Sequence, residues 1–151
     1  MSIKKPCQSV ELINSNYCLG LKYLDNKSIN FLKSFSKKYS VIVVIKGANT
    51  ITVLQDKLYV NTTGNPGLST AGSGDVLTGI ITGLISQGYN PLTAAIFGVY
   101  LHGKSADIAI EDFGYQSLIA SHVIDYLGEA YIDLFKQPEQ PPQEEEESTN
   151  E

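Results

Sequence analysis

The sequence contains no arginine, so all eleven of its basic residues are lysine. Arginine is the side chain that most often reads bases and phosphates through paired hydrogen bonds, and its absence counts against a nucleic-acid-binding protein. Six of the sixteen acids stand within the last fifteen positions, whereas residues 1–136 carry eleven lysines against ten acids. The net charge of −5 therefore arises from the tail, and no cationic stripe remains that could follow a phosphate backbone. We expect no nucleic-acid partner.

Cysteine and long apolar runs are also scarce. Cys7 and Cys18 are the only cysteines, and the basic residues 1–6 are not followed by the apolar segment of a secretory signal. No apolar run reaches the roughly 18 residues that a membrane span needs. We therefore expect a cytoplasmic protein with no membrane partner.

The length and composition are typical of one globular domain, and no internal repeat is present. Residues 1–24 mix apolar and small polar residues without a clean period, so this N-terminal segment is left unassigned. Residues 136–151 combine prolines with a run of four glutamates and are predicted to be disordered, because they cannot bury enough apolar surface. The domain is expected within residues 25–135.

The first half of this domain is predicted to contain one helix and three strands. Apolar residues recur at helical spacing over residues 25–39. The β-branched run 41–45 follows directly and is typical of a strand buried on both faces of a parallel sheet. Residues 50–54 and 58–60 then predict two short strands around the turn 55–57.

The second half is predicted to be a loop followed by three helices. Residues 61–73 are rich in glycine, threonine and asparagine, which indicates a loop. Apolar residues recur at helical spacing in three later segments, namely 75–87, which stops at Gly88, 91–111, which begins at a proline, and 117–135.

Residues 64–79, GNPGLSTAGSGDVLTG, form the most informative stretch. Small residues crowd a loop that leads directly into an amphipathic helix, and such a junction binds anions through backbone N–H groups and the helix dipole. The stretch lacks the Gly-Lys-Ser/Thr ending of a P-loop, and it lacks the third glycine of a dinucleotide-binding loop. We therefore predict a phosphate site of another kind, built on the amides of Ala71, Gly72, Ser73 and Gly74.

Asp75 stands in the first turn of the same helix, beside the predicted phosphate site. An isolated acid in this position most often only complements the helix dipole. Here a carboxylate would repel the bound anion unless it had a task, and the small-residue loop costs chain entropy that a structural turn would not need. Accepting a proton from a hydroxyl that attacks the phosphorus is the task that fits, so we predict Asp75 as a catalytic base.

Lys46 and Gly47 end the predicted buried strand, at the edge where open α/β sheets place their ligands. A lysine there could meet a phosphate, and the sequence alone allows an ordinary exposed lysine equally well. His102, Lys104 and Asp107 lie at near-helical spacing but match no zinc spacing. The small residues around them favour close helix packing, so we predict neither a metal site nor a catalytic role for these three.

Three motifs together resemble a known family. TAGSGDVLTGII, residues 70–81, resembles the signature of the ribokinase-like superfamily. VIKGANT at 44–50, followed by GNPGLSTAGSGD and by VYLHGKSAD at 99–107, is similar more narrowly to the NAD(P)H-hydrate dehydratases over roughly residues 40–130. The resemblance implies an α/β, ribokinase-like three-layer fold. This chain would hold its C-terminal portion, with sheet strands, a small hairpin and three terminal helices.

Members of that family repair hydrated NADH and NADPH by phosphorylating the ring hydroxyl with ADP or ATP and eliminating phosphate. The resemblance implies the same activity here, with Mg²⁺ assisting the phosphates, and it favours ADP as the donor. It implies that Asp75 faces the NAD(P)H hydrate. It also implies that the nucleotide is held by Lys46, Gly47, Ala48, Asn49, Thr50, Ala71, Gly72, Ser73 and Gly74.

The resemblance does not extend to the first half of the family fold. The Pro-His-Pro-x-Glu stretch of these enzymes, and their early glycine- and asparagine-bearing segments, have no counterpart here. We therefore expect an incomplete or split enzyme, which pairs with a second copy or with a complementary N-terminal fragment across an exposed apolar edge. Two alternatives stay open: a kinase for a small alcohol such as a sugar or vitamin precursor, and a noncatalytic nucleotide-binding module.

Overall fold

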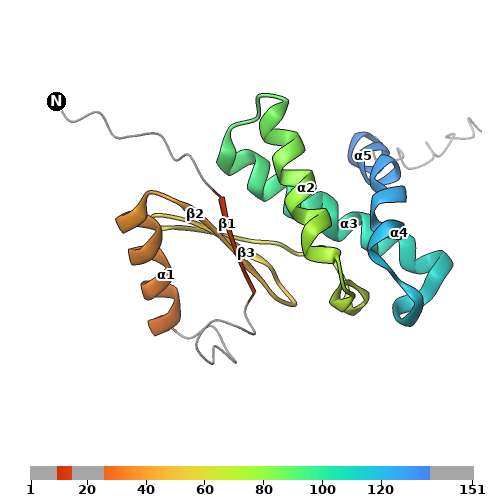
Figure 1. The fold of residues 1–151 in the computed structure, drawn as a ribbon, viewed down its shortest axis with the longest axis horizontal. Helices are drawn as coiled ribbons and strands as arrows, with labels where there is room; N and C mark the ends of the chain where they lie inside the picture. The colour runs from red at the N-terminus through yellow and green to blue at the C-terminus, as the bar shows by residue number, and fades with distance from the viewer. Residues whose placement is uncertain (1–9, 15–25, 137–151) are drawn as a thin grey trace, which may run out of the picture.

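The fold is a layered α/β structure built on one four-stranded sheet (Figure 1). The computed structural model describes residues 10–14 and 26–136. Its elements follow in the order β1 (Val10–Asn14), α1 (Asn26–Tyr39), β2 (Ile42–Lys46), β3 (Ile51–Leu54), β4 (Lys57–Val60), the 3₁₀ helix η1 (Pro66–Ser69), α2 (Ser73–Ser86), α3 (Pro91–Ser117), α4 (Ala120–Asp125) and α5 (Leu127–Phe135). Helix α1 covers one side of the sheet, and α2 and α3 lie on the other.

The sheet is mixed and runs in the order β1-β2-β3-β4. β1 pairs in parallel with β2, from Val10 opposite Ile42 to Asn14 opposite Lys46, whereas β2, β3 and β4 pair in antiparallel fashion. The strand predicted over 41–45 is therefore present one residue later, with one parallel and one antiparallel neighbour. The predicted hairpin is confirmed as β3 and β4. β1 lies in the segment left unassigned from the sequence, and it forms one edge of the described sheet.

Alternate residues of β2 face opposite layers of the fold. Ile42 and Val44 are fully buried in a cluster with residues of α2 and α3. Val43 and Ile45 are buried on the other face, in a cluster with Leu32 of α1. Successive side chains of a strand point to opposite faces, so an uninterrupted apolar strand requires a cover on both. The predicted arrangement of a sheet between helical layers is confirmed.

The helices predicted over 75–87 and 91–111 are confirmed as α2 and α3. They pack closely at Gly98, where an added Cβ would lie 2.7 Å from Cγ1 of Ile81. α3 continues beyond the predicted end to Ser117, although Gly114 departs from helical geometry with φ of 67°.

The single helix predicted over 117–135 is wrong, because this segment forms α4 and α5, which meet at Tyr126. The buried residues of α4 and α5 pack in different clusters. Val123 of α4 packs in a cluster with Ala106 and Ala109 of α3, whereas Ala130 of α5 joins the main core under the sheet. A single straight helix could not direct its apolar face toward both clusters. The break at Tyr126 lets α4 pack against one cluster and α5 against the other.

The remaining expectations concern the loop, the tail and the membrane. The loop predicted over 61–73 contains η1, whose N-cap Asn65 accepts a hydrogen bond from the N–H of Gly67. Within the described ranges, no helix combines the length and the apolar character that a membrane crossing requires. The disorder predicted for the tail falls on residues 137–151, which lie outside the described residues.

Candidate functional site

Helix α2 begins without a side-chain cap. Its N-cap Gly72 has φ of 83°, a left-handed conformation that favours glycine, and makes no side-chain hydrogen bond. The N–H groups of Asp75 and Val76 both donate to the carbonyl of Gly72, at 3.0 and 3.1 Å. The N–H groups of Ser73 and Gly74 precede these bonds, and an α-helix has no carbonyl of its own for its first amides. The start of α2 therefore presents backbone donors together with the positive end of the helix dipole.

Lys46 reaches this helix start from the end of β2. Its Nζ lies 2.9 Å from the point that a Cβ on Gly74 would occupy, so the ammonium fills the space beside Gly74 that a side chain would take. The two residues are far apart in the sequence, and the fold brings them together because β2 ends where α2 begins. The sequence left open whether Lys46 is an ordinary exposed lysine. The structure makes it a half-buried cation beside the predicted phosphate loop.

The other predicted nucleotide-site residues flank this contact. Gly47, Ala48 and Asn49 are exposed in the turn between β2 and β3, where the hydroxyl of Thr50 donates to the carbonyl of Gly47 at 3.5 Å. Ala71 is exposed just before α2. These positions are open to solvent at the same end of the sheet as Lys46, which leaves room for a ligand there.

Asp75 lies in the first turn of α2 with an exposed side chain. Its backbone N–H is already used in the bond to Gly72. The group of Asp75 that remains available to a ligand is therefore its carboxylate, one residue after Gly74. If a phosphate binds at this helix start, as the sequence predicts, the exposed carboxylate stands where a proton acceptor for an attacking hydroxyl would be needed.

One face of α3 holds the loop that leads into α2. The carbonyl of Tyr100 accepts a hydrogen bond from the hydroxyl of Thr63 at 2.9 Å. At Gly103 an added Cβ would lie only 2.3 Å from the same hydroxyl oxygen, so the loop backbone approaches α3 as closely as glycine allows. Asp107 accepts from the N–H of Gly64 at 2.8 Å and from the side-chain amide of Asn65 at 2.9 Å.

His102 makes the corresponding contact to the start of α2. Its side chain is 5% exposed, and its Nε2 lies 2.9 Å from the carbonyl oxygen of Ser73 and 3.2 Å from the Ser73 hydroxyl. Burial lowers the pKa of His102 to about 4; the hydrogen bond to Ser73 opposes this shift, and the charge of Lys46 adds to it. His102 is therefore neutral at neutral pH.

The interpretation of His102, Lys104 and Asp107 as packing residues is incomplete. Lys104 pairs with Asp133 of α5 at 2.8 Å, away from the loop. His102 and Asp107, by contrast, bind the two ends of the glycine-rich loop. The spacing of residues 100, 103 and 107, which lie on one face of a helix, could have indicated the contacts to Thr63 and Gly64. The contact of His102 with Ser73 has no such signal in the sequence. Among the described residues, no group of three His, Cys, Asp or Glu could hold a metal ion.

A sequence profile described as NAD(P)H-hydrate dehydratase matches residues 14–129. The chain belongs to the NAD(P)H-hydrate dehydratase family.

Two bacterial members of the dehydratase family are among the relatives of this chain. The bifunctional NAD(P)H-hydrate repair enzyme Nnr of Moorella thermoacetica is 45% identical over 94 residues, which cover 62% of this chain and 18% of that protein. The ADP-dependent (S)-NAD(P)H-hydrate dehydratase of Neisseria meningitidis is 48% identical over 77 residues, or 50% of this chain and 26% of that one.

Solved structures of the family share the fold. The ADP/ATP-dependent NAD(P)H-hydrate dehydratase of Bacillus subtilis, co-crystallised with ATP and Mg²⁺, gives a TM-score of 0.73 at 25% identity, covering 82% of this chain and 47% of that one. A ribokinase-like superfamily protein of Enterococcus faecalis gives 0.65 at 27% identity, covering 91% and 48%. The chain thus spans about half the length of these solved relatives and a smaller share of the curated ones.

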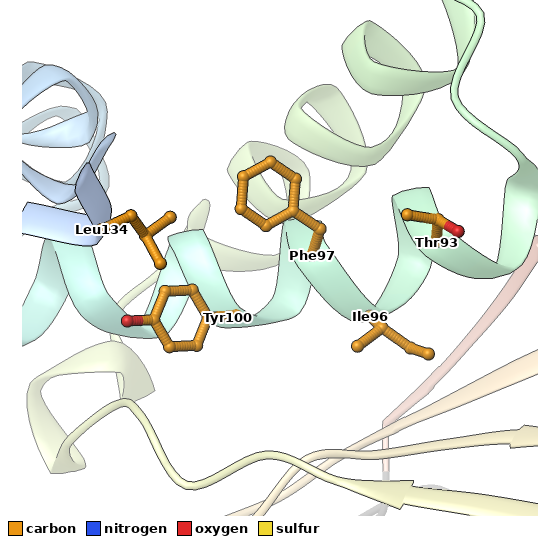
Figure 2. A pocket seen from close by; sticks show the side chains of 5 residues that line it. All are labelled: Thr93, Ile96, Phe97, Tyr100 and Leu134. Atoms are coloured by element: carbon orange, nitrogen blue, oxygen red, sulfur yellow. The ribbon is translucent and has the colours of Figure 1, made fainter. Parts of the chain in front are cut away.

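A separate apolar pocket lies between α3 and α5 of this dehydratase-family chain (Figure 2). Its volume is about 320 Å³, and it is lined by Thr93, Ile96, Phe97, Tyr100 and Leu134. Figure 2 shows Leu134 reaching from α5 toward the side chains of α3. None of the predicted nucleotide-site residues lines this pocket, so it is distinct from the site at the start of α2.

Proposed function

We propose that these residues form the nucleotide-phosphate side of an enzyme that dehydrates hydrated NADH and NADPH, with ADP rather than ATP as the favoured donor. The observation that carries the proposal is the meeting of the Lys46 ammonium with Gly74 at the uncapped start of α2. The names of the relatives add support, since the Neisseria protein is called ADP-dependent and the Bacillus protein ADP/ATP-dependent.

In this scheme a hydroxyl of the hydrated nicotinamide attacks the terminal phosphorus, and the bond from that phosphorus to the rest of the nucleotide breaks. Asp75 accepts the proton of the hydroxyl. Lys46 and the amide of Gly74 stabilise the negative charge on the transferring group. The phosphate ester then leaves as inorganic phosphate, while the neighbouring ring carbon loses a proton and the ring regains its double bond.

Few of the described side chains near the predicted phosphate site could bind Mg²⁺. The described residues hold no cluster of three candidate ligands, and Asp75 is the acid nearest in sequence to the phosphate loop. Mg²⁺ commonly keeps several waters and is held by substrate phosphates with one or two carboxylates. An ion that arrives with the nucleotide fits this donor set. It would neutralise phosphate charge, and the steps assigned above to Lys46, Gly74 and Asp75 do not depend on it.

We also propose that turnover requires the part of the family fold that these residues do not span, whether on the same polypeptide or on another. Two observations support this. The solved relatives are about twice as long, and β1 has a paired neighbour on only one side within the described sheet. The substrate side of the site would then be completed by structure that adjoins this edge.

Replacement of Asp75 by Asn tests the assignment. With the hydrate, Mg²⁺, either ADP or ATP, and the remaining part of the family fold supplied, we expect NADH release, read by its absorbance, to fall by about 10²–10⁴-fold in Asp75→Asn, while nucleotide binding is retained. Asp56→Asn is the control, because Asp56 is an exposed acid in the turn between β3 and β4.

Three outcomes separate the alternatives. Turnover that survives in Asp75→Asn would contradict the role of Asp75 as base. Binding of ADP without turnover is expected of the chain alone, and it would favour a noncatalytic nucleotide-binding module only if turnover stayed absent after the missing part of the family fold had been supplied. A wild-type chain that binds neither ADP nor ATP in a calorimetric titration would overturn the proposed function itself.

A further inference from the structure

The bond between His102 and Ser73 defines which imidazole nitrogen carries the proton. The Nε2 atom of His102 lies 2.9 Å from the Ser73 carbonyl oxygen, which can only accept a hydrogen bond. Nε2 must therefore be the protonated nitrogen, and the neutral Nε2–H tautomer follows from the contact. The Ser73 hydroxyl, 3.2 Å from the same nitrogen, lies close enough to share this donor.

That bond also constrains the next peptide unit. The carbonyl of Ser73 and the N–H of Gly74 belong to one planar trans peptide, in which they point in opposite directions. Because the carbonyl is held toward the buried imidazole, the N–H of Gly74 must face the other way. Gly74 is also the residue that Lys46 approaches, with its Nζ 2.9 Å from the Cβ position.

A neutral imidazole is better suited than a charged one to the buried position of His102 beside Ser73. An imidazolium beneath the loop would stand beside the ammonium of Lys46, and burial already disfavours the charged ring. The neutral ring holds the peptide without repelling Lys46. The positive charge at the helix start then comes from Lys46 and from the backbone N–H groups.

We propose that His102 is a positioning residue for the phosphate site: by holding the Ser73 carbonyl from beneath, it aims the amide of Gly74 at the phosphate that Lys46 also meets. This inference rests on the proposed function, since it assumes that the phosphate of a nucleotide binds at Gly74. His102 itself touches no ligand and transfers no proton.

The test compares two variants of the full 151-residue chain. In His102→Leu the donor is lost, and we expect ADP affinity to fall about tenfold, which corresponds to about one hydrogen bond of preorganisation. In His102→Gln the side-chain amide can still donate from a similar reach, and we expect affinity within about threefold of the wild type on the same scale. His122→Leu is the control, because the ring of His122 stacks on Phe113 and Ser73 is bonded by His102 instead.

Nuclear magnetic resonance of the nucleotide-free chain provides a second readout that packing alone would not move. We expect the ¹⁵N signals of His102 to report a neutral Nε2–H ring at pH 7. We also expect the Gly74 amide to shift in His102→Leu and to return toward its wild-type position in His102→Gln. Because these signals need no nucleotide, they test His102 even if the wild-type chain binds no ADP and the proposed function fails.

Two results would overturn the inference. The first is an Nδ1–H ring or a charged ring at neutral pH. The second is a His102→Leu protein that melts at a lower temperature yet binds ADP as the wild type does, because that pattern marks a residue that only fills space. If His102→Leu does not fold, the ring signals of the wild type and the behaviour of His102→Gln still decide between positioning and packing.

Discussion

At the start of α2, the missing side chain of Gly74 determines how closely Lys46 can approach the backbone. An alanine Cβ there would lie 2.9 Å from the Lys46 Nζ, so the ammonium would have to move. The flexible end of a lysine moves at low cost, and alanine favours a helix over glycine by up to about 1 kcal/mol. We expect Gly74→Ala to keep the melting temperature of the wild type. Its ADP affinity should fall by at least about tenfold, because one charge-assisted contact to the phosphate is lost.

Gly79→Ala is the matched control for Gly74→Ala. Gly79 lies in the same helix, and an added Cβ there would meet no atom within 4 Å. This variant should gain helix stability and bind ADP as the wild type does. Equal ADP affinities for the two variants, measured by calorimetric titration, would mean that Lys46 and Gly74 do not form the phosphate site.

His102 gives the fold a defined dependence on pH. Its pKa is about 4 in the folded chain, mainly because of burial, and 6.5 is the ordinary value. The unfolded chain therefore takes up this proton first as the pH falls, and stability is lost between pH 6.5 and about 4. At about 1.4 kcal/mol for each unit of pKa, the loss from His102 amounts to about 3 kcal/mol.

Urea unfolding at a series of pH values measures this loss. The free energy of unfolding should decline from pH 6.5 toward pH 4.5 in the wild type, and it should decline less steeply in His102→Gln, which has no ring to titrate. Parallel curves for the two proteins would show that His102 titrates alike in the folded and unfolded chains.

At the scale of elements, α3 holds the loop that leads into α2 through hydrogen bonds. Asp107 uses both carboxylate oxygens, one on the N–H of Gly64 and one on the amide of Asn65, which in turn caps η1. In Asp107→Asn a donor would replace one acceptor and would face another donor. We expect a loss of about 1–3 kcal/mol in the free energy of unfolding, together with weaker ADP binding.

Asp133→Asn is the control for Asp107→Asn. Asp133 makes the same kind of contact from an exposed position, to Lys104 at 2.8 Å, and exposed ion pairs contribute little to stability. Urea unfolding of both variants compares them directly. A loss no larger in Asp107→Asn than in Asp133→Asn would show that the loop is held by packing and not by this carboxylate.

The elements that the sequence predicted well are those whose signal is local. The run of β-branched residues in β2 and the small residues before α2 identify a buried strand and a glycine-rich helix start without knowledge of their neighbours. The meeting of Lys46 with Gly74 requires the fold, because no local pattern states that β2 ends beside α2. The break at Tyr126 and the pairing of β1 also depend on distant partners, which explains why a periodic stretch was predicted as one helix and why β1 was missed.

At the scale of the whole molecule, the described fold leaves apolar surface on α5 and one edge of its sheet uncovered. Ile132 and Phe135 of α5 are 60% and 79% exposed, and they lie three residues apart on one face of the helix. β1 forms a sheet edge, whose N–H and C=O groups can pair with a further strand. An exposed apolar helix face and an open strand edge each favour association.

We therefore expect the 151-residue chain to pair with a second copy of itself when it is purified alone, and the helix face of α5 to contribute to that contact. Phe135→Glu should shift the population toward monomer in sedimentation velocity, because a charge would have to be buried in the contact. Phe31→Glu is the control, since Phe31 is 57% exposed on α1, on the opposite side of the sheet. A wild-type chain that sediments as a monomer at all concentrations would contradict the expectation, and an equal response of both variants would assign the association to general hydrophobicity rather than to α5.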